Sequence, residues 1–190
     1  MPLRCDEMFR AQVPAVDRTD WYAFPCHQHS GIKFREGRLE TKLLIDDAGS
    51  QKWGSVSGKA DSWCKWSVEY AGEIPTEDIL ITTGWLAVHK RRHWQVLSMT
   101  DDSVAWQSER VENGCEVEWS VVTVDEKEWW TIGFEAVGEL SDLSGNLSRA
   151  IEYLLGEQTS DTLFTLANSM AYPSWLWKVK TGGVMLPYSG

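Results

Sequence analysis

The chain has 190 residues, of which 43% are hydrophobic and 24% charged, as is typical of a soluble globular protein. Its formal net charge of −10 argues against a nucleic-acid partner, because a phosphate backbone is bound by basic surfaces. No stretch approaches the roughly 20 apolar residues that cross a bilayer, so no membrane partner is expected. The four cysteines lack metal-binding spacing and no secretory segment is apparent, which predicts reduced thiols and a cytoplasmic location. We expect a single domain over residues 1–190.

Turn-forming residues recur along the chain and separate segments rich in Trp, Val, Ile, Thr and Tyr. This pattern is typical of antiparallel hairpins. Glu36-Gly37 and Asn113-Gly114 are the clearest turn signals, because such dipeptides adopt the left-handed conformations that a tight turn needs. The predicted strands are 31–36, 38–46, 61–70, 79–89, 91–99, 103–111, 115–124 and 128–137, with a further candidate near 4–12.

The C-terminal part of the chain has a different periodicity. Between Glu139 and Glu157, leucine and isoleucine recur at spacings of three and four, which predicts an amphipathic helix ending near Gly156. A second, shorter helix is expected over 162–170, before Tyr172-Pro173 breaks it. The predicted fold is therefore mainly β (α+β): an eight-stranded antiparallel closed barrel, or tunnel, with C-terminal helices.

Long charged side chains occupy alternate positions of several predicted strands. Since successive residues of a strand face opposite sides, each set of charges shares one face. Exposure of that face to water is the ordinary explanation, but the matched mixture of cations and carboxylates favours faces that look into a wet barrel interior. Six of the 18 basic residues belong to this phase, which in an acidic chain predicts a localised anion site. The residues concerned are Lys33, Arg35, Lys42, Lys65, Lys90, Arg92, Glu40, Glu69, Glu116, Glu118 and Glu135.

The 12 tryptophans need a place in such a barrel. Trp66 and Trp119 fall on the phase opposite to the charges, where they would be exposed unless helices or another subunit cover them. Packing in a core is the simplest role for them. A stacking platform for bases is the alternative, and the acidic net charge counts against it.

These charged strands, in this order, resemble the CYTH domain of the triphosphate tunnel metalloenzymes. The resemblance covers about residues 17–177 and includes a C-terminal element, Ala171–Leu176, similar to that of some small bacterial members. The matching segments are Gly31–Lys42, Trp63–Ser67, Val88–Arg92, Cys115–Trp119 and Trp129–Glu135.

The resemblance implies an eight-stranded barrel whose tunnel holds a small triphosphate-containing substrate and Mg²⁺ or Mn²⁺. It assigns phosphate binding to Lys33, Arg35, Lys42, Lys65, Lys90 and Arg92, metal binding to Glu116, Glu118 and Glu135, and tunnel lining to Glu40 and Glu69. The implied reaction is metal-dependent hydrolysis of a phosphoric anhydride. The residue types suit it, because hard divalent cations prefer carboxylates, while Lys and Arg offset charge on phosphoryl oxygens.

The start of the chain departs from the family pattern. The family's ExExK strand is matched only by Asp6-x-Met8-x-Arg10, in which Met8 replaces one glutamate. The sequence therefore leaves open whether the protein hydrolyses its ligand. One alternative is a non-catalytic relative that binds a phosphorylated or organic anion. Another is a calycin-like carrier of an apolar ligand, which inward-facing Trp, Phe and Leu would favour.

Two further features remain as expectations. The segment Cys26-His27-Gln28-His29 contains residue types that bind metal ions, but the sequence offers no partner pair of Cys or His. A surface loop is therefore the favoured interpretation. The sequence also leaves open whether the protein forms a homo-oligomer.

Overall fold

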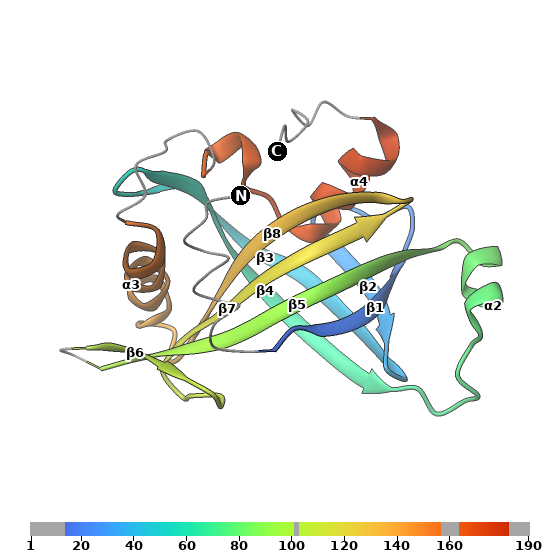
Figure 1. Cartoon of the computed structure of the whole chain (residues 1–190), viewed down its shortest axis with the longest axis horizontal. Coiled ribbons are helices and arrows are strands. Elements are labelled where there is room, and N and C mark those ends of the chain that lie inside the picture. The colour runs from blue at the N-terminus through green and yellow to red at the C-terminus, as the bar shows by residue number, and fades with distance from the viewer. Residues whose placement is uncertain (1–13, 101–102, 157–163, 183–190) are drawn as a thin grey trace.

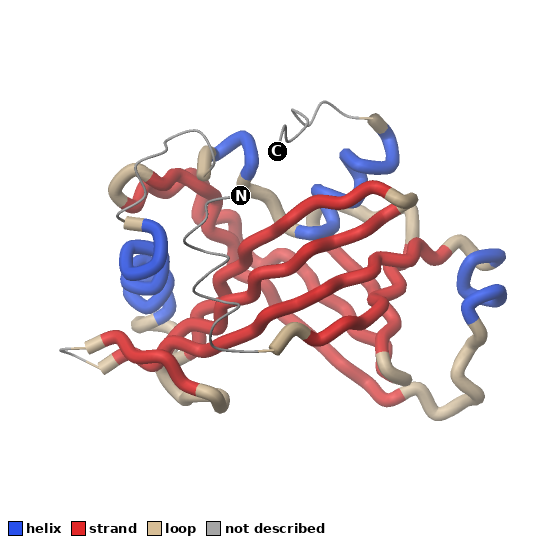
Figure 2. The backbone as a smooth tube through the Cα atoms, in the orientation of Figure 1, coloured by secondary structure: helices blue, strands red, loops and turns tan. Residues whose placement is uncertain are grey.

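The computed structural model describes residues 14–100, 103–156 and 164–182, and the fold is mainly β (Figures 1 and 2). Eight antiparallel strands form one sheet with the order β4-β3-β2-β1-β5-β7-β8, and β6 pairs with β5. The strands are β1 (Val16–Ala23), β2 (Ser30–Arg35), β3 (Arg38–Trp53), β4 (Val56–Glu69), β5 (Trp85–Met99), β6 (Val104–Gln107), β7 (Gly114–Val124) and β8 (Lys127–Val137).

The sheet curls until its two ends approach each other. Lys42 of β3 and Glu135 of β8 form an ion pair with Nζ 3.4 Å from Oε2. Nevertheless, no ladder joins β4 to β8 among the described strands, so the predicted closed barrel is not confirmed. The segment 164–173 lies at this gap instead (Figure 1). Its Phe164 carbonyl accepts a hydrogen bond from the Ser57 amide of β4 at 3.0 Å, which satisfies one of the backbone groups at the edge of β4.

One predicted hairpin is confirmed and one is wrong. Arg35 pairs with Arg38 around Glu36 and Gly37, whose φ values of 49° and 72° are those of a tight hairpin turn. The Asn113-Gly114 dipeptide does not join the two strands beside it, because β6 pairs with β5, and β7 pairs with β5 and β8. Gly114 has another role: a Cβ there would collide with the Leu97 carbonyl oxygen, so the glycine permits close approach of β5 and β7.

The region predicted as strands 79–89 and 91–99 forms one helix and one long strand. Helix α2 (Glu77–Thr82) begins after Thr76, whose side chain accepts the Ile79 amide, and acidic residues occupy its first turn. Both features stabilise a helix N-terminus. Leu80 of α2 packs with Trp21 and Phe34 on the outer face of the sheet. Strand β1 was not predicted, and the candidate near 4–12 lies outside the described residues.

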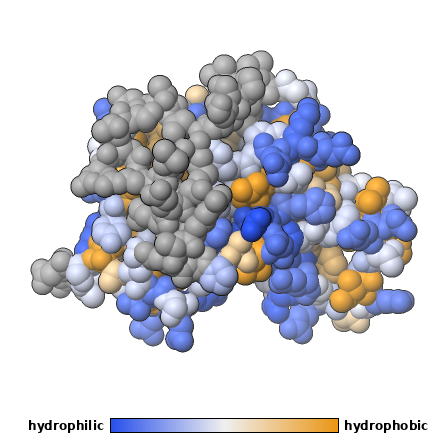
Figure 3. Space-filling model, in the orientation of Figure 1, coloured by the Kyte–Doolittle hydropathy of each residue, from blue (hydrophilic) through white to orange (hydrophobic). Residues whose placement is uncertain are grey.

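Helix α3 (Leu143–Leu155) confirms the predicted amphipathic helix, although it begins later than expected. It packs on the outer face of β7 and β8, where Trp119 is only 2% exposed. Trp66, on the outer face of β4, remains 53% exposed. On the face of the molecule in Figure 3, hydrophobic residues form separate patches among hydrophilic ones.

Of the second predicted helix, 162–170, the described residues from 164 on contain a 3-10 turn, η1 (Leu166–Asn168), and α4 (Tyr172–Thr181) begins where a break was expected. Pro173 lies in the first turn of α4, where its fixed φ suits the helix and its missing N–H needs no partner. None of the helices in the described part of the chain is long and apolar enough to cross a membrane.

The start of α4 fills one end of the curled sheet. Trp175 and Leu176 are buried with Tyr22, Val88 and Val122, which all project from the inner face. Close contact there depends on Gly31 of β2, because an added Cβ would lie 2.9 Å from Pro173 Cγ. The rest of the inner face surrounds a cavity.

Candidate functional site: a charged cavity on the inner face of the sheet

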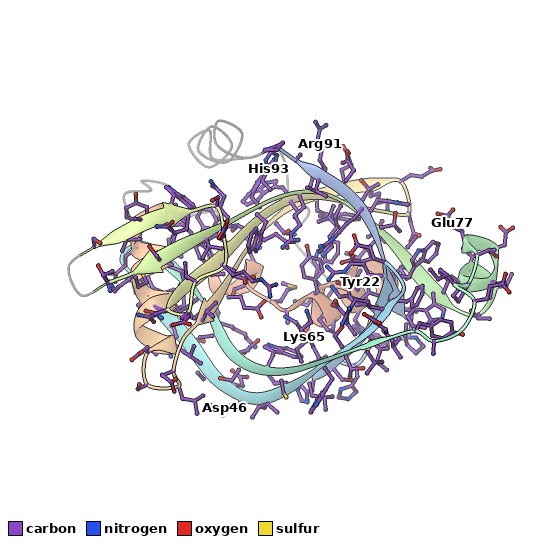
Figure 4. All side chains as sticks on the ribbon, turned by 90° about the horizontal axis from the view of Figure 1, so that it is seen from below. Tyr22, Asp46, Lys65, Glu77, Arg91 and His93 are labelled. Carbon is purple, nitrogen blue, oxygen red and sulfur yellow. The ribbon has the colours of Figure 1, made fainter. Side chains whose placement is uncertain are left out.

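A cavity of about 660 Å³ lies on the inner face of the sheet. Strand phase brings ten of the eleven predicted charged residues to its wall, as Figure 4 shows for Lys65, whereas Arg91 of the opposite phase points away. This grouping is a structural finding, and the binding roles assigned to the residues stay predictions. The ten are Lys33, Arg35, Lys42, Lys65, Lys90, Arg92, Glu40, Glu116, Glu118 and Glu135.

Glu69 does not line the cavity, so its prediction as a tunnel-lining residue is wrong. Its phase is that of Lys65, but it lies at the end of β4, opposite Arg38 beside the β2–β3 turn. There its carboxylate is 3.1 Å from an Arg38 nitrogen, and its side chain is 82% exposed. Strand β4 extends past the cavity. The alternation of residues in the sequence predicts which face Glu69 occupies, but it does not predict where the cavity ends.

Asp20 of β1 is a fully buried carboxylate that faces four cations. Its oxygens lie 3.2 Å from Arg18 Nε, 3.4 Å from Lys33 Nζ, 3.5 Å from Lys90 Nζ and 4.0 Å from Arg35 Nε. The Lys90 side chain is 3% exposed. Such a buried charge needs close partners, because leaving it unpaired would be costly.

Glu40 of β3 extends the same network. Its oxygens lie 2.6 Å from an Arg35 nitrogen, 3.1 Å from Lys33 Nζ and 3.5 Å from Lys65 Nζ. Among the described residues, two carboxylates therefore share five cations at this part of the cavity. We call this group the cationic end, and it consists of Arg18, Asp20, Lys33, Arg35, Glu40, Lys65 and Lys90.

The pKa values of the cationic end reflect competition between burial and charge. Burial would raise the pKa of Asp20, but the attraction of Lys90, Lys33, Arg18 and Arg35 outweighs it and lowers that pKa. The Glu40 pKa is also lowered, since Lys33, Arg35 and Lys65 outweigh its burial. Burial is the largest influence on Lys33 and lowers its pKa, despite the opposing attraction of Asp20. Both carboxylates are therefore ionised at neutral pH.

In the other part of the cavity, each carboxylate forms an ion pair with one cation among the described residues. The contacts are Arg92 Nε to Glu118 at 2.6 Å, Arg110 Nε to Glu116 at 3.4 Å and Lys42 Nζ to Glu135 at 3.4 Å. We call these six residues the paired end. It is more exposed than the cationic end, with the side chains of Arg110 and Glu135 at 81% and 66% exposure.

Each of the three glutamates to which metal binding was assigned forms an ion pair with a basic side chain. Glu116 and Glu135 are direct neighbours across β7 and β8, but Glu116 accepts the Trp94 indole at 3.1 Å and contacts Arg110. Among the described residues, no group of three or more His, Cys, Asp or Glu side chains could hold a metal ion. The same holds for the Cys26–His29 loop, where the rings of His27 and His29 pack edge to face. Binding of Mg²⁺ or Mn²⁺ by Glu116, Glu118 and Glu135 therefore stays a prediction.

Several cavity residues were missed by sequence reasoning. Arg18, Asp20 and Tyr22 alternate along β1 as the other inward residues do, so the signal was present but the strand was expected near 4–12. Asp6, Met8 and Arg10 lie outside the described residues. Tyr172 of α4 gave no local signal.

Tyr172 covers the buried Lys90. Lys90 Nζ lies 3.7 Å from the centroid of the Tyr172 ring, a distance typical of a cation–π contact. The Tyr172 hydroxyl is 3.0 Å from Thr131 Oγ1 of β8, and burial raises the tyrosine pKa well above its usual value. The C-terminal segment thus contributes a wall of the cavity, so the site depends on α4 as well as on the sheet.

The fold and the site together define a small antiparallel β protein with a cation-rich cavity inside an open, curled sheet. Comparisons with protein-family models, with curated proteins and with solved structures find no match. The resemblance to the triphosphate tunnel metalloenzymes is therefore not supported by a relative, and the function must be argued from the cavity.

Proposed function

We propose that the protein binds a small phosphorylated anion of the triphosphate class through the cationic end of its cavity. The observation that carries this proposal is the imbalance at that end, where Asp20 and Glu40 share five cations. Among the described residues, eight basic and four acidic side chains line the cavity, and Asp20 lies beneath them, in a chain whose net charge is −10. This local excess of positive charge favours an anionic ligand.

Burial makes the excess charge effective. Charges interact more strongly in a site of low dielectric than at an exposed surface, and Lys33 and Arg35 have side chains only 16% and 17% exposed. Lys and Arg nitrogens form short, charge-assisted hydrogen bonds with phosphate oxygens. The five cations project from β1, β2, β4 and β5, so the sheet preorganises them before the ligand arrives.

The proposal is one of binding, and no hydrolytic step is derived. Each glutamate that the resemblance assigns to the metal is engaged by a cation: Glu116 by Arg110, Glu118 by Arg92 and Glu135 by Lys42. A cavity with an excess of cations is also a poor match for the alternative of a carrier whose ligand is wholly apolar.

Calorimetric titration with sodium tripolyphosphate tests the proposal. We expect Arg35→Ala to weaken binding by about tenfold or more, because hydrogen bonds to charged groups contribute roughly 1.5–3 kcal/mol. Lys65→Ala should act in the same direction with less effect on folding, since the Lys65 side chain is 41% exposed. Arg91→Ala is the matched control: it removes an exposed cation from the outer face of β5 and should leave affinity within about twofold.

Two results would contradict the proposal. One is the absence of tripolyphosphate binding to the folded wild-type protein. The other is an equal loss of affinity in the Arg35→Ala, Lys65→Ala and Arg91→Ala variants, which would place the anion on the outer surface. Ligand-induced thermal stabilisation gives an independent readout, because a ligand specific for the folded state raises Tm.

A further inference from the structure

The outer face of the sheet has an exposed apolar area beside strand β4. Ile32 of β2 and Leu43 of β3 are 42% and 38% exposed, and Trp66 and Val68 of β4 are 53% and 58% exposed. Strand pairing places all four on the face opposite to the cavity, and the residues paired with them are uncharged. Apolar side chains that are gathered on one face and stay exposed mark a surface for contact with another molecule.

Trp66 and Val68 also lie at the edge of the sheet. Strand β4 comes last in the order of the described sheet, and every residue from 65 to 70 is exposed. Figures 1 and 2 show this half of β4 along the rim of the molecule. The edge of a sheet presents backbone N–H and C=O groups with which another strand can pair.

The segment 164–169 already pairs with the first part of this edge. It accepts the amides of Ser57 and Lys59 at 3.0 Å and 2.8 Å. Since successive backbone groups of a strand point to opposite sides, the odd-numbered residues from 61 to 69 also direct their N–H and C=O groups to this edge. The rest of the edge therefore presents the same backbone groups to an occupant beside the apolar area.

The charges of β4 restrict how a second copy of the strand can lie along the edge. Two identical strands pair antiparallel about a two-fold axis, which sets one residue opposite its own copy. An axis at Lys65 would set Lys65 opposite its copy and Asp61 opposite Glu69. Like charges directly opposite on neighbouring strands are destabilising, so this arrangement is unfavourable.

An axis one residue further along, at Trp66, avoids these repulsions and pairs the apolar side chains. Trp66 then faces its own copy, and Val68 faces Cys64 of the second copy, on the outer face. These are non-hydrogen-bonded pairs, in which side chains approach most closely, because only odd-numbered residues direct their backbone to the edge. The opposite pairs over residues 63–69 are Trp63 with Glu69, Cys64 with Val68, Lys65 with Ser67 and Trp66 with Trp66. None of these pairs joins two charges of one sign.

We propose that the protein forms a homodimer in which β4 of two copies pair antiparallel over residues 63–69, about an axis at Trp66. The contact is isologous, so it closes after two copies. It covers Trp66 and Val68 and leaves the cavity of each copy on its own inner face. The inference goes beyond the proposed function, because the dimer needs no ligand.

Sedimentation velocity from about 1 µM to about 1 mM tests the dimer, since small interfaces give weak complexes. We expect the wild type to pass from one chain to two as the concentration rises. Ser67→Pro should weaken dimerisation by about tenfold or more, because proline removes an N–H that faces the edge and leaves the ladder with β3 intact. Asp61→Pro is the matched control: it removes an N–H of the same kind outside residues 63–69 and should leave dimerisation within about twofold.

A side-chain substitution gives a second test, which holds if Ser67→Pro does not fold. Trp66→Glu sets a carboxylate opposite its own copy and should weaken dimerisation by about tenfold or more. Ile79→Glu is the matched control, because Ile79 of α2 is 52% exposed and lies outside the proposed contact. It should leave dimerisation unchanged.

Oxidative cross-linking tests the position of the axis. Val68→Cys places a thiol opposite Cys64 of the second copy, with about 4.5 Å between the Cα atoms, a distance that a disulfide accepts. Within one chain the two thiols are about 13 Å apart along the strand and cannot form a bond. We expect diamide to give a disulfide-linked dimer of Val68→Cys, and an added Cys64→Ser substitution should abolish it.

Three results would overturn parts of this proposal. The mass of a single chain at every concentration would exclude the homodimer and assign the apolar edge to a different protein. A dimer that both Ser67→Pro and Trp66→Glu leave intact would place the contact elsewhere. A dimer of Val68→Cys that diamide does not cross-link would exclude the axis at Trp66. None of these measurements uses tripolyphosphate, so the proposed function is tested separately.

Discussion

The two ends of the cavity contain the same kinds of side chain and differ in how these are arranged. At the cationic end, two buried carboxylates are shared among five cations, and Asp20 and Glu40 are 0% and 3% exposed. At the paired end, each carboxylate has its own cation, and Glu135 is 66% exposed in its side chain. The cationic end therefore differs from the paired end because its carboxylates are buried and each of them contacts several cations.

The comparison teaches that ion pairs on one sheet can have different uses. Exposed pairs contribute little to stability, because water screens them and ordering their side chains costs entropy. A buried group cannot lose one member without leaving charge uncompensated. The cationic end is therefore both a structural network and a reservoir of unmatched positive charge, whereas the paired end is neither.

The largest predicted effect is on stability. Asp20→Asn should lower the free energy of unfolding by about 3–5 kcal/mol, since it neutralises the buried carboxylate that four cations contact. The matched change at the paired end, Glu135→Gln, should cost less than about 1 kcal/mol. Urea unfolding followed by tryptophan fluorescence measures both. Similar losses in the two variants would mean that the ends do not differ energetically.

The same Asp20→Asn variant should respond more strongly to ligand. With one carboxylate neutralised, the excess of positive charge grows, so a given concentration of tripolyphosphate should raise its Tm by more than it raises that of the wild type. A smaller rise would show that Asp20 orders the cations rather than competing with the anion for them.

The packing of α4 against β2 can be changed by one substitution. Gly31→Ala should destabilise the protein by about 1–3 kcal/mol, because its Cβ would lie 2.9 Å from Pro173 Cγ at the start of α4. Gly133→Ala is the control: it is also on the inner face, and its Cβ would meet nothing within 4 Å. Thermal unfolding of both variants should show a loss for Gly31→Ala alone. Equal Tm values would mean that α4 can shift without cost.

The affinity for the anion should depend on pH through the loss of the Lys33 proton. Its pKa is lowered from 10.5, chiefly by burial, so it loses its charge at a lower pH than an exposed lysine. Tripolyphosphate affinity should therefore fall as the pH rises through this lowered pKa. The contribution of Lys33 to folding changes in the opposite direction, because the burial of its charge ceases to oppose folding once the proton leaves.

Lys33→Arg provides the comparison for this titration, since a guanidinium stays charged across the whole range. Calorimetry at several pH values between 7 and 10 should show a steeper loss of affinity for the wild type than for Lys33→Arg. Identical profiles would assign the loss to other groups.

The smallest predicted effect concerns the paired end. Glu118→Gln should free Arg92 from its 2.6 Å ion pair and make this end resemble the cationic one. We expect tripolyphosphate affinity to rise by about threefold to tenfold, equivalent to roughly 1 kcal/mol. An unchanged affinity would confine the anion to the cationic end.

Much of the site could be predicted because strand phase is a local property. Residues two apart on a strand share a face whatever the rest of the fold does, so Lys33 with Arg35, Lys90 with Arg92 and Glu116 with Glu118 could be assigned together. The Glu36-Gly37 turn was equally local. The phase of a strand shows which face a residue occupies, but it does not show how far the strand extends along the cavity. For that reason Glu69 was included, although its position on β4 lies past the cavity.

Errors arose where the same local signal has two structural uses. Tyr172-Pro173 was predicted to end a helix and begins one, because proline is unfavourable inside a helix and favourable in its first turn. Asn113-Gly114 was predicted to form a hairpin, whereas Gly114 permits two strands to approach. Only the neighbouring elements decide between such uses.

The sequence by itself determined an antiparallel β fold, the amphipathic helix α3 and a face of alternating charges. The tertiary structure decided that the sheet stays open, that the segment 164–173 lies at its gap, and that Tyr172 covers Lys90. It also decided that Asp20 and Glu40 share their cations while Glu118 and Glu135 have one each. Periodicity specifies which side a residue faces, but ion pairing and burial depend on distances between residues far apart in the chain, and those are set only when the sheet curls and α4 packs inside it.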